Sequence, residues 1–187
     1  MTIIETERLQ LRLWQPGDVE PFVRINADPL VTEFLPGPVT PDEAQALFGR
    51  QSALFEQHGT CYFAAALRET SELVGFLGLK YTADGLPFAP CFDIGWRLGS
   101  QWWGGGLATE GALAALRLGF ERLGLEEIVS FTVPAIVRSQ RVMERIGMMR
   151  DVEGDFDHPA LAVGHRLGRH VLYRIDGKGY SAPRQLE

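Results

Sequence analysis

Three consecutive glycines, Gly104, Gly105 and Gly106, stand at the start of a predicted helix in the stretch "QWWGGGLATEGA", residues 101–112. Each glycine inside a helix costs about 1 kcal/mol relative to alanine, so a run of three favours a role for bare backbone. A helix start offers unpaired N–H groups and the positive end of the helix dipole, which a phosphate can approach closely where side chains are absent. The run is therefore a candidate phosphate site. The residues alone also allow a flexible turn whose glycines permit tight packing.

Two other glycine-rich phosphate loops do not fit this stretch. A Walker loop ends in Gly-Lys-Ser/Thr, whereas the chain reads "GLATEG". A dinucleotide fingerprint, G-x-G-x-x-G, follows an early strand, whereas Gly104 and Gly106 are followed by Ala108 far along the chain. A nicotinamide-dependent dehydrogenase is therefore disfavoured.

A second polar cluster, "DFDHP", holds Asp155, Asp157 and His158. The histidines at 158, 165 and 170 do not have a zinc-site spacing, so we expect no metal. A pocket wall or loop-stabilising hydrogen bonds are the preferred interpretation.

The surrounding pattern predicts helices and strands without strict βαβ alternation, which favours an α+β protein. Thr40 and Glu43 form a capping box, Pro41 suits the first helical position and Gly59 the exit, so a helix is expected between them. The other expected elements are a short helix within 15–28, a helix from the glycine run to 124, a short helix at 139–148, and strands at 8–14, within 61–81 (two), at 91–98, at 128–133 and, within the loop-rich end, at 170–175.

The composition is that of an ordinary globular chain of 187 residues, 45% hydrophobic and 22% charged, and predicts a single domain over residues 1–187. No apolar run is long enough for a membrane helix and the start lacks a targeting pattern, so a cytoplasmic protein is expected. A net charge of −6 disfavours nucleic acid and attracts cations such as amines. Cys61 and Cys91 are expected to be buried strand cysteines rather than a disulfide or metal pair.

The segment from "DIGWRLGSQWWGGGLATEGA" through "FERLGL" to "SQRVMERIGM" resembles the GNAT acyltransferase family, specifically its RimJ/RimL-like branch. Residues 101–108 stand at the Q/R-x-x-G-x-G-x-A signature of that family. The resemblance is dense over residues 92–148 and weaker at the start and at "HVLYRI". It implies the GNAT fold, with a mixed, mainly antiparallel sheet flanked by helices, and acetyl-CoA as co-substrate.

The resemblance also implies which residues bind acetyl-CoA. The pyrophosphate would lie on the N–H groups of residues 104–109, and the strand at 93–98 would pair with the pantetheine, while the strand at 128–133 splays away and opens a V. Gly95 would admit close backbone approach, and a strand N–H would polarise the thioester carbonyl. The expected cofactor-binding residues are Ile94, Gly95, Trp96, Leu98, Gln101, Gly104, Gly105, Gly106, Leu107, Ala108, Thr109, Arg138, Ser139 and Arg141.

The sequence departs from the family pattern at and just before the helix expected at 139–148. Ile136 replaces the family's asparagine, Met143 stands where other branches have a tyrosine that protonates the departing thiolate, and Ser139 keeps a hydroxyl for the pantetheine or thiolate. The cluster of arginines at 138, 141, 145 and 150 is either a solvated helix face or a contact to a cofactor phosphate.

The expected catalytic residues are Asp93 and Ser139, and the expected substrate-binding residues are Glu33 and Asp93. Asp93 takes the place of the family's strand glutamate, as the base that deprotonates an amine or as a structural hydrogen-bonding group. Glu110 is expected to cap the phosphate helix and favour its dipole. Trp102 and Trp103 are expected in the core, or one of them in the cofactor channel.

The sequence therefore predicts an N-acetyltransferase that moves an acetyl group from acetyl-CoA to a primary amine by direct attack. An acyl-CoA-binding sensor without turnover is the alternative. The acceptor is a small-molecule amine, slightly favoured, or a peptide N-terminus, and the acids at 33, 93, 155 and 157 predict that it is cationic. A homodimer is one candidate assembly.

Overall fold

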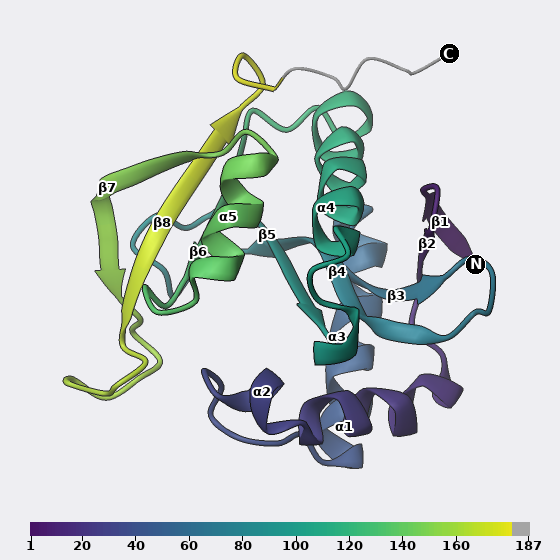
Figure 1. Cartoon of the computed structure of the whole chain (residues 1–187). Coiled ribbons are helices and arrows are strands. Elements are labelled where there is room, and N and C mark those ends of the chain that lie inside the picture. Colours follow the sequence, from purple (N-terminus) through teal and green to yellow (C-terminus); the bar gives the residue numbers. More distant parts are fainter. Residues whose placement is uncertain (181–187) are drawn as a thin grey trace.

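The computed structural model describes residues 1–180, and within them eight strands form one sheet, drawn in Figure 1. The strand order is β1-β2-β3-β4-β5-β6-β8-β7, and each neighbouring pair is antiparallel except β5 and β6. The strands are β1 (Thr2–Glu5), β2 (Leu9–Arg12), β3 (Tyr62–Leu67), β4 (Leu73–Thr82), β5 (Cys91–Leu98), β6 (Glu127–Thr132), β7 (Met149–Asp157) and β8 (Arg169–Asp176). The expected mixed, mainly antiparallel sheet is confirmed.

The helices are α1 (Val19–Ala27), α2 (Pro29–Thr32), α3 (Pro41–His58), α4 (Leu107–Arg117) and α5 (Val137–Arg145). The predicted capping box at α3 is confirmed: Thr40 N–H donates to Glu43 Oε2 at 2.8 Å and Glu43 N–H to Thr40 Oγ1 at 3.3 Å. The helix ends at Gly59 in the left-handed conformation, as the sequence indicates. Beyond α4 the chain continues as a π-helical turn over Leu118–Arg122.

Two hydrophobic clusters hold the helices on the sheet. The larger one joins α4 and α5 to β2–β6 and β8, and α4 and α5 lie on the same side of the sheet in Figure 1. The smaller one packs Phe22 of α1, Val31 of α2 and Phe48 of α3 on Phe76 of β4. Because side chains alternate along a strand, successive residues of β4 and β5 point to opposite faces of the sheet, one covered by α4 and α5 and the other by α1, α2 and α3.

The sheet opens between β5 and β6. Eight residue pairs join β5 to β4, from Thr82–Cys91 to Gly75–Leu98, whereas β5 and β6 pair through Asp93 and Val129 alone in the described chain. Ser130 Oγ donates to the carbonyl of Ile94 at 2.9 Å at the point where the strands part. The splay that the resemblance implies is present, and β5 keeps an unpaired backbone edge beyond it.

Two strands were not expected from the sequence. β1 pairs with β2 across a turn whose residues Thr6 and Arg8 donate hydrogen bonds to Glu110 of α4. The contact that holds this turn is therefore distant in sequence. β7 runs through "MRDVEGDFD", a segment that the sequence assigns mainly to a loop. Its charged residues and glycine do not favour a strand, but pairing with β8 stabilises one. As to membranes, residues 1–180 contain no helix of the length and apolarity that a transmembrane span requires.

Candidate active site

A cavity of about 700 Å³ opens where β5 and β6 part. Its walls come from α2 and the residues after it, from β3–β6, from the loop before α4, from α4 and α5, and from the two ends of the β7–β8 loop. The volume is that of a site for a sizeable small molecule.

The glycine run forms one end of this cavity. Gly104 and Gly106 have φ values of +79° and +82°, a region that L side chains rarely adopt. A Cβ on Gly104 would meet nothing within 4 Å, and one on Gly106 only the guanidinium of Arg8 at 3.5 Å. Tight packing is therefore not the reason for these glycines. They set the backbone conformation and leave open space in front of it.

The start of α4 is available to an anion. Gly106 is the N-cap residue of α4, and no side chain caps the first N–H groups of the helix. Glu110, expected to cap α4, instead accepts hydrogen bonds from Thr6 Oγ1 at 2.6 Å, Arg8 N–H at 2.8 Å and Arg8 Nε at 2.6 Å. Burial opposes the ionised form of Glu110, but these hydrogen bonds outweigh it and lower the pKa of the carboxyl group. Glu110 therefore does not cap the first N–H groups of α4, but it lies in the first turn of the helix, where the helix dipole favours a negative charge as expected.

Most of the residues expected to bind acetyl-CoA line the cavity: Ile94, Gly95, Trp96, Leu98, Gly104, Gly106, Ala108, Thr109, Arg138, Ser139 and Arg141. Three others do not appear in its walls. Gln101 is exposed, the carbonyl of Gly105 accepts a hydrogen bond from Arg8 Nη1 at 2.7 Å, and the side chain of Leu107 is buried in the larger core.

Helix α5 brings basic and hydroxyl side chains to the same end. Arg138, Ser139, Arg141 and Arg145 line the cavity together with Ile136 and Met143. The guanidinium of Arg138 lies 3.8 Å from the ring centroid of Trp103 and donates to the carbonyl of Leu30 at 3.4 Å. Arg138 thus bridges α5, the loop before α4 and α2, while Arg141 and Arg145 make no ion pair within residues 1–180.

Asp93 lies at the point of splay, with 1% of its surface exposed. Its carboxylate accepts hydrogen bonds from the Tyr62 hydroxyl at 2.9 and 3.0 Å, and Lys80 Nζ lies 3.3 Å from Oδ1. Burial raises the pKa of Asp93, and the Lys80 charge and the Tyr62 hydrogen bond oppose that rise. A carboxylate with a raised pKa in a cavity is a candidate general base.

The absence of a side chain at Gly95 has a structural explanation other than the expected approach of a ligand backbone. A Cβ on this residue would lie 2.6 Å from the Tyr62 hydroxyl oxygen and 2.8 Å from the ring carbon that bears it. Tyr62 pairs with Gly78, and Gly78 with Gly95, so the phenol ring extends from β3 over both glycines to reach Asp93. The missing side chain at 95 makes room for Tyr62 rather than for a ligand on that face.

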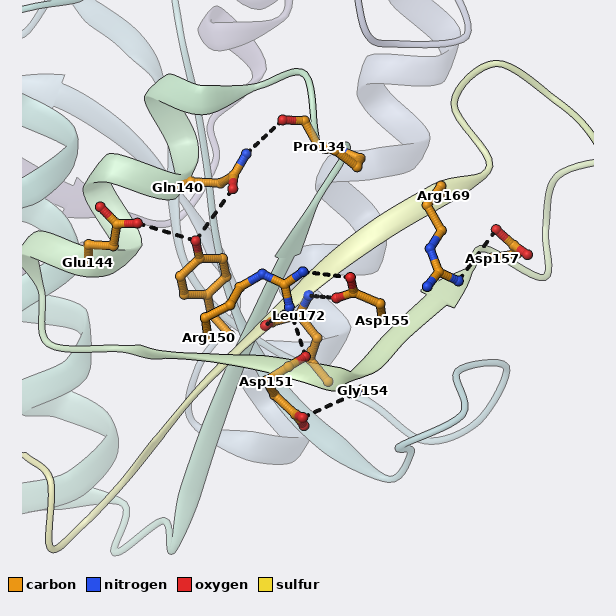
Figure 2. Close-up of polar contacts among 11 residues, drawn as sticks. Pro134, Gln140, Glu144, Arg150, Asp151, Gly154, Asp155, Asp157, Arg169 and Leu172 are labelled. Atoms are coloured by element: carbon orange, nitrogen blue, oxygen red, sulfur yellow. Dashed lines mark hydrogen bonds and ion pairs between the residues drawn. The ribbon is translucent and has the colours of Figure 1, made fainter.

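The other acids expected near the cleft lie elsewhere. Glu33 is exposed and outside the cavity walls, although Val31, Phe34 and Leu35 beside it are part of them. Figure 2 shows Asp155 paired with Arg150 at 2.5 Å and Asp157 facing Arg169 at 3.9 Å. Of the four acids expected near the cleft, Asp93 alone is among the residues that line the cavity.

A pocket wall was one interpretation of "DFDHP" from the sequence, and His158 of that stretch lines the cavity, but His170, Tyr62, Lys80 and Arg97, which also line it, were missed. His158 and His170, with ring centroids 5.2 Å apart, form part of an aromatic wall with Phe131, and burial is the main cause that lowers the pKa of each. Tyr62, Lys80 and Arg97 also line the cavity. The alternation of Asp93, Gly95 and Arg97 along an otherwise apolar strand was a signal for Arg97, and no comparable signal marked Tyr62 or Lys80. Among residues 1–180, no three His, Cys, Asp or Glu side chains gather as a metal site.

This architecture is shared with solved acetyltransferases. A GNAT-family acetyltransferase from Bacillus anthracis superimposes with a TM-score of 0.76, at 26% identity over 95% of this chain and 99% of that one. An acetyltransferase from Agrobacterium tumefaciens str. C58 has a TM-score of 0.73 at 27% identity, covering 94% of each chain. The fold and the comparisons therefore define an acetyltransferase.

The chain belongs to the GNAT acetyltransferase domain family, whose pattern matches residues 8–149. It is 28% identical over 150 residues to the uncharacterized N-acetyltransferase YnaD of Bacillus subtilis (strain 168), covering 79% of this chain and 83% of YnaD. A shorter match, 38% identical over 56 residues, is to the FsC-acetyl coenzyme A-N(2)-transacetylase of Aspergillus fumigatus, covering 30% of this chain and 24% of that enzyme.

Proposed function

We propose that this acetyltransferase moves an acetyl group from acetyl-CoA to a primary amine, of a small molecule or a peptide N-terminus, by direct attack of the amine. One observation carries the proposal: an uncapped, glycine-bounded helix start lies at one end of the cavity and the unpaired edge of β5 runs from it to Asp93. The helix start suits a phosphate, and the strand edge suits the amide groups of an extended chain attached to that phosphate. The residue pattern at 92–148 further supports placement in the RimJ/RimL-like branch.

The residues present fit acetyl-CoA. The unpaired N–H groups at the start of α4 suit a pyrophosphate, and Arg141 and Arg145 of α5 suit a further phosphate. The free edge of β5 suits the pantetheine amides. When bound there, acetyl-CoA supplies a thioester carbonyl as the acetyl source. The name of the Aspergillus fumigatus relative, which specifies acetyl coenzyme A, supports this choice of donor.

In the proposed reaction Asp93 accepts the proton that the acceptor's ammonium group must lose before its nitrogen forms the amide bond. Burial raises the pKa of this carboxylate, and Lys80 and Tyr62 both favour its ionised form against that effect. Ser139 lines the cavity and is the proposed hydroxyl contact for the pantetheine or the departing thiolate. Met143 provides no acid at the position where other branches have tyrosine.

Direct transfer, without an acetyl-cysteine intermediate, is consistent with the two thiols. Neither Cys61 nor Cys91 lines the cavity, and burial raises their pKa values to about 12 and about 11. Both thiols therefore remain protonated near neutral pH and are poor nucleophiles.

Titration calorimetry with acetyl-CoA, followed by thiol release with a panel of amines, tests the proposal. We expect binding below millimolar concentration and amine-dependent release of free thiol, with the rate retained in Cys91→Ala. Absence of binding near millimolar acetyl-CoA would refute the donor assignment. Binding without release for any peptide, amino acid or polyamine would restore the sensor alternative, which the N-acetyltransferase relatives do not favour.

A further inference from the structure

The charges in the cavity wall have the opposite balance from the whole chain. The chain carries a net charge of −6, yet among the described residues that line the cavity Asp93 is the one carboxylate. The basic residues in the same walls are Lys80, Arg97, Arg138, Arg141 and Arg145. An electrostatic preference of this cavity for a cationic acceptor, as expected from the sequence, is therefore not supported.

Arg97 lies apart from the arginines of α5. Asp93, Gly95 and Arg97 alternate along β5 and share a sheet face with their cross-strand neighbours Lys80, Gly78 and Phe76. Ile94 and Leu98, at the intervening positions, belong to the core under α4. Arg138 of α5 contacts Trp103 and the carbonyl of Leu30, whereas Arg97 contacts Asn26 of α1 and the ring of Phe76.

The guanidinium of Arg97 is held in place but not neutralised. Its Nη1 donates to Asn26 Oδ1 at 2.7 Å, and its central carbon lies 5.3 Å from the ring centroid of Phe76. Asn26 is itself fixed, because it is fully buried and its Nδ2 donates to the carbonyl of Phe22 at 2.8 Å. In the part of the chain that the structure describes, Arg97 makes no ion pair with a carboxylate.

This arrangement leaves a half-buried positive charge facing a cavity. Burial lowers the pKa of Arg97 to about 10, so the group is still charged at neutral pH but is poorly solvated. A desolvated cation without a paired anion is unfavourable, and an anionic ligand group that reaches it gains a charge-assisted, bidentate contact.

The surface between Arg97 and Asp93 is aromatic. Their Cα atoms are four residues apart on one strand, a separation of about 13 Å. The rings of Tyr62 and Phe76 lie between them, stacked with centroids 5.0 Å apart and an interplanar angle of 14°. A carboxylate for an amine, two stacked rings and a guanidinium therefore follow one another along one wall of the cavity.

We propose that the acceptor is an amine that also carries a carboxylate at its far end, which Arg97 binds while the amine faces Asp93. The inference rests on the proposed function and specifies its substrate class. The body of the acceptor is apolar or planar, since it lies along Tyr62 and Phe76. Arg97 is thus a specificity-determining residue that does not touch the reacting atoms.

Matched acceptor pairs test this inference. The probes are 4-(aminomethyl)benzoate against 4-(aminomethyl)benzamide and 6-aminohexanoate against 6-aminohexanamide, with thiol release giving kcat/KM. We expect the carboxylate member to be preferred at least tenfold in one or more pairs. Arg97→Met should abolish this preference, mainly through KM, and Arg97→Lys should retain part of it.

Arg141→Met is the matched control, since it removes an arginine from the α5 wall of the same cavity. It should weaken acetyl-CoA binding in calorimetry and leave the carboxylate-to-amide ratio unchanged, whereas Arg97→Met should do the reverse. Equal rates for both members of every pair, or a loss of acetyl-CoA affinity in Arg97→Met, would overturn the assignment of Arg97. If acetyl-CoA binds and no amine releases thiol, the proposed function fails, and calorimetric binding of the carboxylate probes with and without Arg97 still decides this inference.

Discussion

The two walls of the cavity are built in different ways. The wall proposed to bind acetyl-CoA, called the donor wall, consists of β5, the glycine loop and the first turns of α4 and α5, and it offers mainly backbone groups: a free strand edge and an uncapped helix start. The wall proposed to face the acceptor, called the acceptor wall, consists of side chains such as Tyr62 of β3, Phe76 of β4 and Asp93 of β5, which come from three adjacent strands, with α2 and the β7–β8 loop at its margin. Backbone geometry depends on a short local pattern, whereas a side-chain constellation depends on how strands align.

Because the two walls are built differently, we expect acetyl-CoA binding and the transfer reaction to respond to different substitutions. Donor groups made of N–H and C=O are present in any sequence that keeps the fold and the glycines. The acceptor wall, in contrast, changes with single substitutions at positions that the fold tolerates. We therefore expect changes on one wall to alter acetyl-CoA affinity and changes on the other to alter turnover, with little effect across the cavity.

The largest expected effect is that of Asp93→Asn, which keeps the size of the side chain and removes the base. General-base catalysis contributes roughly 10²–10⁴-fold, so thiol release should fall by about a hundredfold or more. Calorimetry should show unchanged acetyl-CoA affinity, and the thermal midpoint verifies the fold. Normal turnover in Asp93→Asn would mean that the carboxylate is a structural partner of Tyr62 and Lys80.

The next effect belongs to the donor wall. Gly106→Val places a β-branched side chain at φ +82° and in the space in front of the first N–H groups of α4. Acetyl-CoA affinity should fall tenfold or more, about 1.4 kcal/mol, measured by calorimetry.

Gly85→Val is the control for that variant. Gly85 has a similar φ of +78°, a Cβ there also meets nothing within 4 Å, and it lies outside the cavity walls. Both variants should lose stability through backbone strain, but Gly85→Val should keep its affinity. Equal affinities in the two variants would contradict the phosphate role of the glycine run.

The smallest effect is a shift in pH dependence from Tyr62→Phe. Burial raises the pKa of Asp93, and the Tyr62 hydrogen bond, after the Lys80 charge, opposes that rise. Removing the hydroxyl should raise the pKa of Asp93 further, so the acidic limb of the kcat/KM profile should move to higher pH. Tyr180→Phe, which removes a hydroxyl that donates to Glu121 at 3.0 Å away from the cavity, should leave the profile unchanged. A profile that moves to lower pH, or does not move, would exclude this role for Tyr62.

The sequence predicts much of the fold, and most residues of the cavity wall around the glycine run, because their determinants are local. Thr40, Glu43 and Gly59 delimit α3 within a few residues of chain, and the strand "CFDIGWRL" is found with its observed limits. Gly104 and Gly106 indicate an open helix start by their residue type alone. These features need no knowledge of which strands are neighbours.

The acceptor wall could not be predicted in the same way. Tyr62 reaches Asp93 because Tyr62 pairs with Gly78 and Gly78 with Gly95, a register that no short stretch of sequence specifies. Asp155 and Asp157 appear free in "DFDHP", but Arg150 of the same strand pairs with Asp155 across the irregularity of β7, and Arg169 of β8 faces Asp157. These two carboxylates are therefore paired with arginines and do not line the cavity.

The single contact between Asp93 and Val129 divides the sheet into two units, β1–β5 and β6–β8–β7, that share helices but almost no backbone ladder. Units of this kind can open separately, each with its own free energy. A molecule bound along the edge of β5 and against α5 would contact both units. Its binding would then increase the cooperativity of unfolding as well as the midpoint of the unfolding transition. In native-state hydrogen exchange, the two units should then lose protection at different denaturant concentrations in the free protein and together in the bound one.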